Sequence, residues 1–364
     1  MSVASSALVL PAGFRVSVAP MMDWTDRHCR SFHRLLSRRA WLYTEMVTAQ
    51  AIAHGDLDHL LGRGEEGERV VLQLGGNDPQ LLARAAREGQ AYGYDEINLN
   101  CGCPSDRVRE GAFGACLMAE PERVADCVAA MQAVVQVPVT VKHRIGIDRR
   151  EDYEFVHRFV DVVAAAGCRR FVVHARNAWL DGLDPKQNRE IPPLRYEVVH
   201  RLAQDFPHCA FELNGGLQDL AHGLAAVCPE GAEDGRPATR LVGAMYGRRA
   251  YHDPWLLAGV DDWLARHAAE APVTDAAQPL TRAAVVEALV GYLERGAAHG
   301  VEVRHLARHV LGLYLGQPAA RLWRRMLSDS RALSRNDPGL LREACAAVEA
   351  EVARVAVSAL SGRS

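Results

Sequence analysis

The stretch VVLQLGGNDPQLLARAAREGQAYGYDEINLNCGCPS, residues 70–105, indicates the type of fold. Two short runs rich in apolar residues, Val70–Leu74 and Glu96–Asn100, flank the segment Leu81–Ala91, whose apolar residues recur at helical spacing. This order predicts a parallel β-α-β unit, because parallel strands need a long crossover that a helix usually supplies.

The same alternation continues from residue 15 to about residue 260, with further amphipathic segments at Glu122–Val135 and Asp152–Ala166. The other predicted strands are Arg15–Ala19, Trp41–Glu45, Val139–Lys142, Arg170–His174, Ala210–Asn214 and Leu241–Tyr246. Eight strands in β-then-α order over about 240 residues predict an α/β fold of the (β/α)₈ TIM-barrel type. A doubly wound open sheet is the alternative.

The chain divides into a barrel and a smaller all-helical domain. We expect an N-terminal extension at 1–14, the barrel at 15–270, the helical domain at 280–356 and a frayed tail at 357–364. Pro272–Pro279 is the predicted linker. The turn-rich segment Cys228–Thr239 is the predicted loop insertion before the eighth strand.

Composition excludes several classes of protein. The 364 residues are 49% hydrophobic and 24% charged, as in globular proteins, and no apolar run reaches the roughly 20 residues of a membrane span. The start, MSVASSALVLPAGFR, lacks the basic region of a secretory signal. The nine scattered cysteines favour reduced thiols in a cytoplasm, with no metal site. At a net charge of −3, nucleic-acid binding requires a local basic patch.

Polar or glycine-rich residues follow most of the predicted strands. They are APMMD (19–23), QLGGN (73–77), NLNCGCPS (98–105), VKHR (141–144), HAR (174–176), NGG (214–216) and YGRR (246–249). Active sites of barrels lie at the carboxyl ends of the strands, so these residues together predict one lined pocket.

Two of these strand ends suit a phosphate group. In Asn214-Gly215-Gly216 and Gly247-Arg248, glycine lets backbone N–H groups approach a ligand, and the seventh and eighth loops of barrels often hold phosphate. The alternative is two tight turns that join strand to helix.

Lys142 and His174 end neighbouring strands and would face one cavity. A flavin needs cationic or hydrogen-bonding groups at the edge of its ring, because reduction leaves negative charge there. Gln73 would add a hydrogen bond to the ring. Taken singly, Lys142 is better explained as a surface lysine, and His174 as a core histidine.

Cys103 lies just after the fourth strand, two residues from Cys101. A thiol at a barrel mouth suits a nucleophile, a metal ligand or a general acid. No nearby residues complete a set of four metal ligands, and the alternative is a buried structural thiol.

The helical domain carries a local basic patch. Between Val301 and Arg335 there are seven arginines and two acids, a local charge of +5. Arg321, Arg324 and Arg325 lie on neighbouring faces of one predicted helix. This pattern is typical of a phosphate-backbone footprint, or of a solvated helix face.

These motifs resemble the flavin-dependent tRNA-dihydrouridine synthases. The resemblance runs from APMMDWTDRHCR (19–30) through INLNCGCPSDRVREGAFGACLM (97–118) and VPVTVKHRIG (137–146) to HLARHVLGLYLGQPAARLWRR (305–325). GAFGACLM, NREIPPL and RLWRR resemble the branch that acts at uridines 20 and 20a of the tRNA D-loop. Cys101 departs from the small aliphatic residue usual in relatives.

The resemblance implies FMN as cofactor, NADPH as electron donor and tRNA as substrate, with Cys103 as the catalytic acid and no membrane partner. It implies flavin packing or hydrogen bonding for Pro20, Met21, Met22, Gln73, Lys142 and His174. It implies FMN phosphate binding for Asn214, Gly215, Gly216, Gly247 and Arg248. It implies tRNA contacts for Asn100, Lys186, Arg189, Arg321 and Arg324.

We expect a cytoplasmic monomer. Two other functions fit parts of the sequence: an FMN barrel oxidoreductase acting on a free pyrimidine or other small molecule, and a tRNA-binding protein without catalysis. The first leaves the arginine-rich helical domain unexplained. The second leaves the set of Gln73, Cys103, Lys142 and His174 unexplained.

Overall fold

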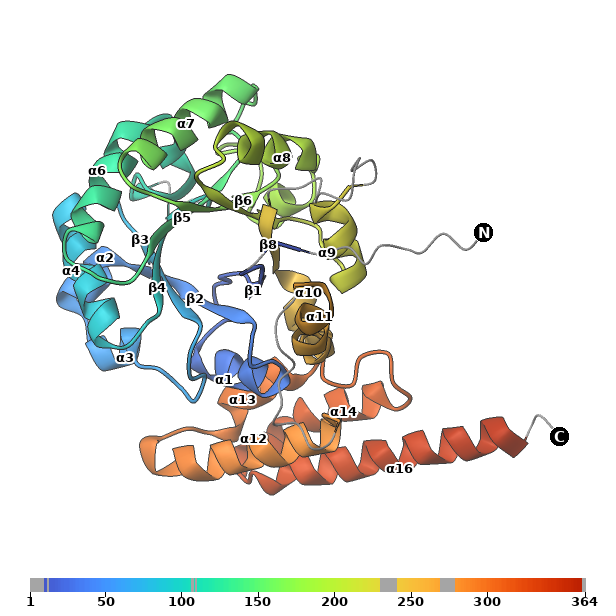
Figure 1. Cartoon of the computed structure of the whole chain (residues 1–364). Coiled ribbons are helices and arrows are strands. Elements are labelled where there is room, and N and C mark those ends of the chain that lie inside the picture. The colour runs from blue at the N-terminus through green and yellow to red at the C-terminus, as the bar shows by residue number, and fades with distance from the viewer. Residues whose placement is uncertain are drawn as a thin grey trace, which may run out of the picture.

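The protein folds into a closed barrel of parallel strands with a helical region attached (Figure 1). The computed structural model describes residues 10–11, 13–105, 108, 110–229, 241–268 and 279–361, with side chains to residue 355. The strands are β1 (Arg15–Val18), β2 (Trp41–Thr48), β3 (Val70–Gly75), β4 (Glu96–Cys101), β5 (Val139–Arg144), β6 (Arg170–His174), β7 (Ala210–Asn214) and β8 (Leu241–Tyr246). The (β/α)₈ prediction is confirmed.

Helices surround the barrel, and their order agrees with the predicted alternation. The α-helices are α1 (Arg27–Leu36), α2 (Ala49–His54), α3 (Leu57–Leu61), α4 (Pro79–Ala91), α6 (Pro121–Gln132), α7 (Tyr153–Ala165), α8 (Tyr196–Asp205), α9 (Leu220–Val227), α10 (Arg248–His252) and α11 (Val260–His267). The 3₁₀ helices are η1 (Gly114–Ala119), η2 (Gln187–Arg189) and η4 (Pro254–Gly259). Several strands continue past their predicted ends, because backbone pairing carries on into polar residues such as His143 and Arg144.

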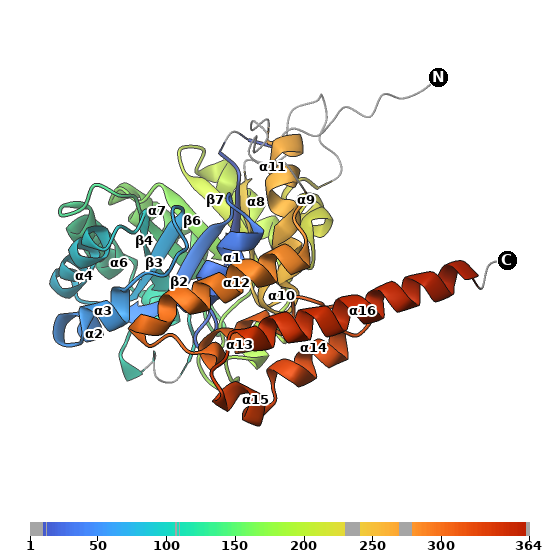
Figure 2. The same cartoon turned by 90° about the horizontal axis from the view of Figure 1, so that it is seen from below.

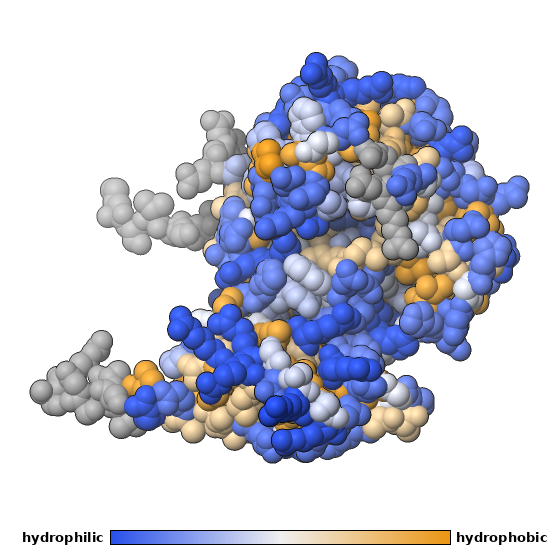
Figure 3. All heavy atoms as spheres, turned by 180° about the vertical axis from the view of Figure 1, so that it is seen from behind, coloured by the Kyte–Doolittle hydropathy of each residue, from blue (hydrophilic) through white to orange (hydrophobic). Residues whose placement is uncertain are grey.

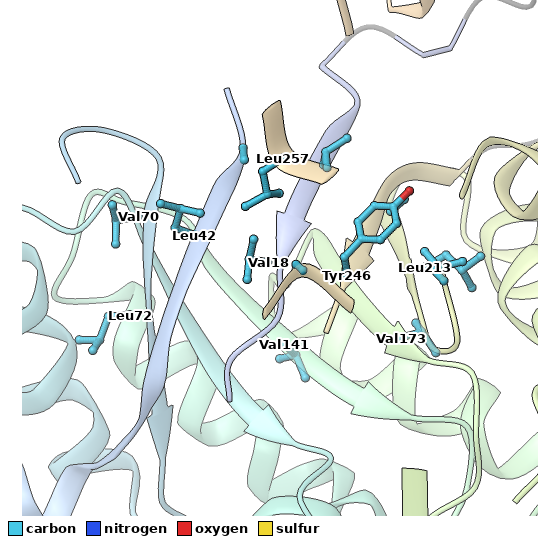
Figure 4. Close-up of a cluster of buried hydrophobic side chains, with 14 of the residues drawn as sticks. Val18, Leu42, Val70, Leu72, Val141, Val173, Leu213, Tyr246 and Leu257 are labelled. Carbon is cyan, nitrogen blue, oxygen red and sulfur yellow. The ribbon is translucent and has the colours of Figure 1, made fainter. Parts of the chain in front are cut away.

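The main core lies between the strands and their helices. Along each strand, alternate side chains point outward, and those of Leu42, Leu72, Val141 and Val173 belong to this layer (Figure 4). The inner side holds a smaller apolar cluster of Ala19, Tyr43, Val71, Val172 and Met245.

Charged residues also lie inside the barrel. The fully buried carboxylates of Glu96 and Glu212 form ion pairs with Arg15 and Arg170, at 2.6 and 2.8 Å respectively. This ionic layer fills the amino-terminal part of the barrel, so the inward side chains nearer the carboxyl ends are the ones available for chemistry.

The C-terminal helical region packs against α1 on one side of the barrel. Its elements are α12 (Arg282–Gly296), η5 (Ala297–His299), α13 (Val303–Val310), α14 (Ala320–Leu327), α15 (Ser330–Ser334) and α16 (Gly339–Ser361). Helix α16 thus runs past residue 357, where we expected the tail to begin, and its end projects from the body of the molecule (Figure 2). The insertion and the linker fall largely outside the described residues.

Part of the predicted N-terminal extension joins the fold. Leu10 and Phe14 are buried, and the Leu10 amide donates to the His267 carbonyl of α11 at 2.7 Å. Because Leu10 lies five residues before the start of β1, α11 marks the amino ends of the strands. Among the helices that the structure describes, none has the length and hydropathy needed to cross a membrane.

Candidate functional site

The candidate site lies at the carboxyl ends of the strands, on the side where the helical region approaches the barrel. In Figure 2, α13, α14 and α15 lie opposite to α11, which marks the amino ends. The loops after β1 and β8 contact this region directly: the Arg308 guanidinium binds the Asp26 carboxylate, and the Tyr251 hydroxyl donates to the Arg308 carbonyl. The helical region therefore stands beside the barrel mouth.

A chain of buried amides crosses the inner face of β3 and β4. The Gln73 amide donates to the Asn98 Oδ1 at 2.9 Å, and the Asn100 amide donates to the Gln73 Oε1 at 2.8 Å. All three side chains are buried. Gln73 is thus fixed in orientation, while its amide retains further hydrogen-bonding capacity.

Asn100 links this chain to the loop that carries Cys103. Its Oδ1 accepts the backbone N–H groups of Gly102 and Cys103, at 3.1 and 3.0 Å. The resemblance implies a tRNA contact for Asn100; in the structure its buried side chain supports the thiol-bearing loop.

The Cys103 loop is closed from its other side by Gly114. The Cys103 carbonyl accepts the Ala115 N–H at 2.9 Å, and Gly114 adopts a positive φ of 68°. A Cβ on Gly114 would come within 2.6 Å of the Cys103 carbonyl oxygen. The half-buried Cys103 Sγ lies 3.3 Å from the Ser105 Oγ, so the thiol is accessible and its loop is held in place.

Cys101 occupies a different environment. It is the last residue of β4, points outward and is fully buried in the core between strands and helices. Burial raises the pKa of its thiol well above the ordinary value, because a thiolate there would lose its solvation. Cys103 is therefore the accessible thiol of the pair.

Lys142 points into the site from β5. Its ammonium donates to the Asn214 Oδ1 at 3.1 Å, and the Asn214 amide donates to the Met245 carbonyl at 2.8 Å. Burial, followed by the charge of Arg144, lowers the pKa of Lys142 to about 7. This half-buried ammonium has one protein acceptor, so it has donors left for an anionic group.

His174 lies at the end of β6, next to Gly215. Burial, together with Arg144 and Lys142, holds its pKa well below the ordinary value, so the imidazole is neutral near pH 7. It offers a hydrogen bond and no positive charge. His143 points to the opposite side, against Phe159 and Phe171.

Arg144 is the main residue of the site for which the sequence predicted no role of its own. Only 3% exposed, its guanidinium donates to the carbonyls of Gly102, Asn177 and Asn188, at 3.0, 3.0 and 2.8 Å. It thus joins the Cys103 loop to the two segments that follow β6. The available signal was strand alternation, since Lys142 and Arg144 share one face of β5.

The predicted phosphate loops are tightly built. Gly215 and Gly216 have positive φ values of 126° and 69°, and a Cβ on either would meet Leu194 at less than 3 Å. Gly247 precedes α10, whose first residue, Arg248, forms an ion pair with Glu190. Gly215 and Gly216 are therefore needed by their turn, whereas Gly247 has a φ of −97° and space for a Cβ; the Arg248 side chain already has a carboxylate partner.

The other predicted contacts are spread around the mouth. Pro20 and Met21 are half-buried, whereas Met22 is 52% exposed. Lys186 and Arg189 are exposed on the segment after β6, and Arg189 lies within electrostatic range of Cys103. Of these five residues, Arg189 is thus the one linked to the Cys103 loop.

The basic patch is smaller than the sequence count implies. Arg304 and Arg308 form ion pairs with Glu302 and Asp26. The other five of the seven arginines between Val301 and Arg335 are exposed: Arg321, Arg324, Arg325, Arg331 and Arg335. Hydrophilic side chains cover most of this region in the space-filling view (Figure 3).

The donor set suits an anionic, planar cofactor better than a metal ion. Lys142, Gln73 and His174 offer hydrogen-bond donors. They lie beside the turn that contains the positive-φ residues Gly215 and Gly216. Within the described ranges, no group of three or more His, Cys, Asp or Glu side chains is placed to hold a metal ion.

Comparison with known proteins identifies the family to which the chain belongs. The sequence model of the family described as Dihydrouridine synthase (Dus) matches residues 17–351. A tRNA-dihydrouridine(20/20a) synthase of Synechocystis sp. is 52% identical over 336 residues, covering 90% of this chain and 93% of the relative. The enzyme of the same name from Escherichia coli K12 is 50% identical over 331 residues, covering 91% and 90%. The chain belongs to the dihydrouridine synthase family.

Proposed function

We propose that this protein is an FMN-dependent oxidoreductase that reduces uridine to 5,6-dihydrouridine at positions 20 and 20a of the tRNA D-loop, with NADPH as electron donor. The observation that carries the proposal is the convergence of Cys103, Lys142, Gln73 and His174 at one barrel mouth. The two relatives named above, at 50% identity or more, support the substrate and its positions.

Reduction of the C5–C6 bond requires a hydride at C6 and a proton at C5. When bound, FMN would supply the hydride, with NADPH as the source of its electrons. The Cys103 thiol gives its proton to C5 and becomes a thiolate.

The remaining residues hold the cofactor and the substrate. Lys142, Gln73 and His174 would bind the flavin ring and ribityl chain, beside Pro20, Met21 and Met22. Backbone N–H groups of Gly215, Gly216, Gly247 and Arg248, near Asn214, would bind the phosphate. Asn100, Lys186 and Arg189 would meet the everted target nucleotide, and Arg321 and Arg324 the tRNA backbone.

The test is dihydrouridine mapping in unmodified tRNA incubated with the flavin-loaded protein and NADPH. The parent is expected to modify positions 20 and 20a. Cys103→Ala is expected to retain flavin and tRNA affinity and to lose most reduction, because only the proton donor is removed. Cys101→Ala is the matched control and should stay active. An active Cys103→Ala beside an inactive Cys101→Ala would reassign the acid.

A further inference from the structure

An unassigned cavity of about 520 Å³ lies on the rim of the barrel, in the loops that follow η1, β5 and β6. We call it the rim pocket and define it by Arg149, Arg150 and Trp179; Ala119, Ile147, Asp148 and Asp181 complete its lining. Its volume falls in the range of about 300–1,000 Å³ that is typical of small-molecule sites. None of its residues serves the proposed chemistry.

The composition of the rim pocket points to a nucleotide. Trp179 is 37% exposed, and its indole offers a face on which a base can stack. Arg149 and Arg150 are exposed beside it and offer donors to a phosphate. The Asp148 carboxylate accepts the Leu180 N–H at 2.7 Å, so it also serves to shape the wall.

The walls of the rim pocket are held by backbone pairing. The Asp148 N–H donates to the Ala178 carbonyl at 2.7 Å, and the Ala178 N–H donates to the Gly146 carbonyl at 2.9 Å. Ile147 and Arg150 exchange two further backbone hydrogen bonds across their turn. The arginines and the indole are therefore displayed by connected segments.

The rim pocket is also tied to the Cys103 loop. The fully buried Asn188 side chain bonds both the N–H and the carbonyl of Trp179, at 2.7 and 2.8 Å. Arg144 in turn binds the Asn188 carbonyl and the Gly102 carbonyl. A base on Trp179 would thus sit at a fixed offset from the reacting thiol.

We propose that the rim pocket binds an unstacked nucleotide of the substrate tRNA, with its base on Trp179 and its phosphate on Arg149 and Arg150. The proposal rests on the proposed function. RNA is favoured over a dinucleotide because Trp179 is fastened to the segment that carries Lys186 and Arg189, the predicted tRNA contacts. By seating a second nucleotide, the pocket would select the position of the uridine that reaches Cys103.

The test uses the full-length, flavin-loaded protein and unmodified tRNA. Trp179→Ala is expected to raise the KM for tRNA roughly 5- to 50-fold, as loss of one stacked base does, and Trp179→Phe to restore most of it. Arg149→Ala with Arg150→Ala should reduce the slope of log affinity against log salt by about 1.4, or about 0.7 for each phosphate contact. Arg158→Ala, an exposed arginine of α7 paired with Glu122, is the matched control.

The outcomes separate the two proposals. If the parent makes no dihydrouridine, the proposed function fails whatever the variants do. If the parent is active and the tryptophan and arginine variants keep its KM and salt slope, the rim pocket is overturned. A rise in the KM for NADPH alone would also overturn it, by assigning the pocket to the dinucleotide. Should Trp179→Ala not fold, the double arginine variant alone decides, since it changes only exposed side chains.

Discussion

Replacing Arg144 by methionine should separate loop positioning from cofactor binding. The substitution keeps an apolar stem and removes the donors to the carbonyls of Gly102, Asn177 and Asn188. Hydrogen bonds from a charged donor contribute about 1.5–3 kcal/mol each. Burial lowers the pKa of Arg144 to about 10, so removing the buried charge recovers about 3 kcal/mol. The net loss of unfolding free energy is about 2–6 kcal/mol.

The rate of dihydrouridine formation by Arg144→Met should fall by more than its loss of stability explains. Without Arg144, the Cys103 loop loses one of its anchors, and a displacement on the order of 1 Å can cost about 100-fold in rate. We therefore expect kcat for dihydrouridine formation to drop by about that factor at temperatures where the variant is folded. Urea denaturation and single-turnover reduction of tRNA measure the two quantities.

Arg169 offers a matched control for this experiment. Its guanidinium also binds backbone carbonyls, those of Ala164 and Cys168, but at the amino end of β6, away from the site. Because Arg169 is exposed, Arg169→Met should lose less stability than Arg144→Met, and it should keep kcat. The positioning role of Arg144 is refuted if Arg144→Met is destabilised yet reduces tRNA at the parent rate.

Three further predictions follow from the site and the core. Burial lowers the pKa of Lys142 to about 7, so its ammonium loses its proton as the pH rises; FMN retention should weaken between about pH 6 and about pH 8, and Lys142→Met, measured by flavin fluorescence, should abolish that dependence. A dependence that persists in the variant would exclude Lys142 as its source. Arg321→Ala with Arg324→Ala should raise the KM for tRNA and reduce the salt slope by about 1.4; an unchanged slope would make them a solvated face. The buried Arg30–Glu66 pair, 2.8 Å apart, should make Glu66→Ala lose about 3–5 kcal/mol in urea denaturation, whereas a loss below about 1 kcal/mol would contradict an uncompensated buried charge.

Alternation along the strands made much of the site predictable. Gln73 and Lys142 were expected in the pocket because polar residues at the carboxyl ends of barrel strands point inward or upward. The same rule, applied to β4, would also have separated the outward Cys101 from the inward Asn98 and Asn100. Local sequence carries this information because the period of a strand fixes which side each residue faces.

Charge counts along the chain were less reliable. The local charge of +5 included Arg308, whose partner, Asp26, lies 282 residues away at the start of α1. A linear count cannot include such a partner, because ion pairs form between whatever side chains the fold brings together. The arginines of α14 and α15 are exposed, so the positive charge counted from the sequence is found on these two helices.

The barrel, the helical region and the group of residues at the mouth could be predicted from the sequence, because they depend on short-range periodicity and on motifs. The way in which Arg144 joins the Cys103 loop to Asn177 and Asn188, and in which Asn188 fixes Trp179, became visible only in the folded chain. The carbonyls that Arg144 binds come from residues 33 to 44 positions away from it in the chain. Their meeting depends on the closure of the barrel, which places the ends of β4, β5 and β6 side by side.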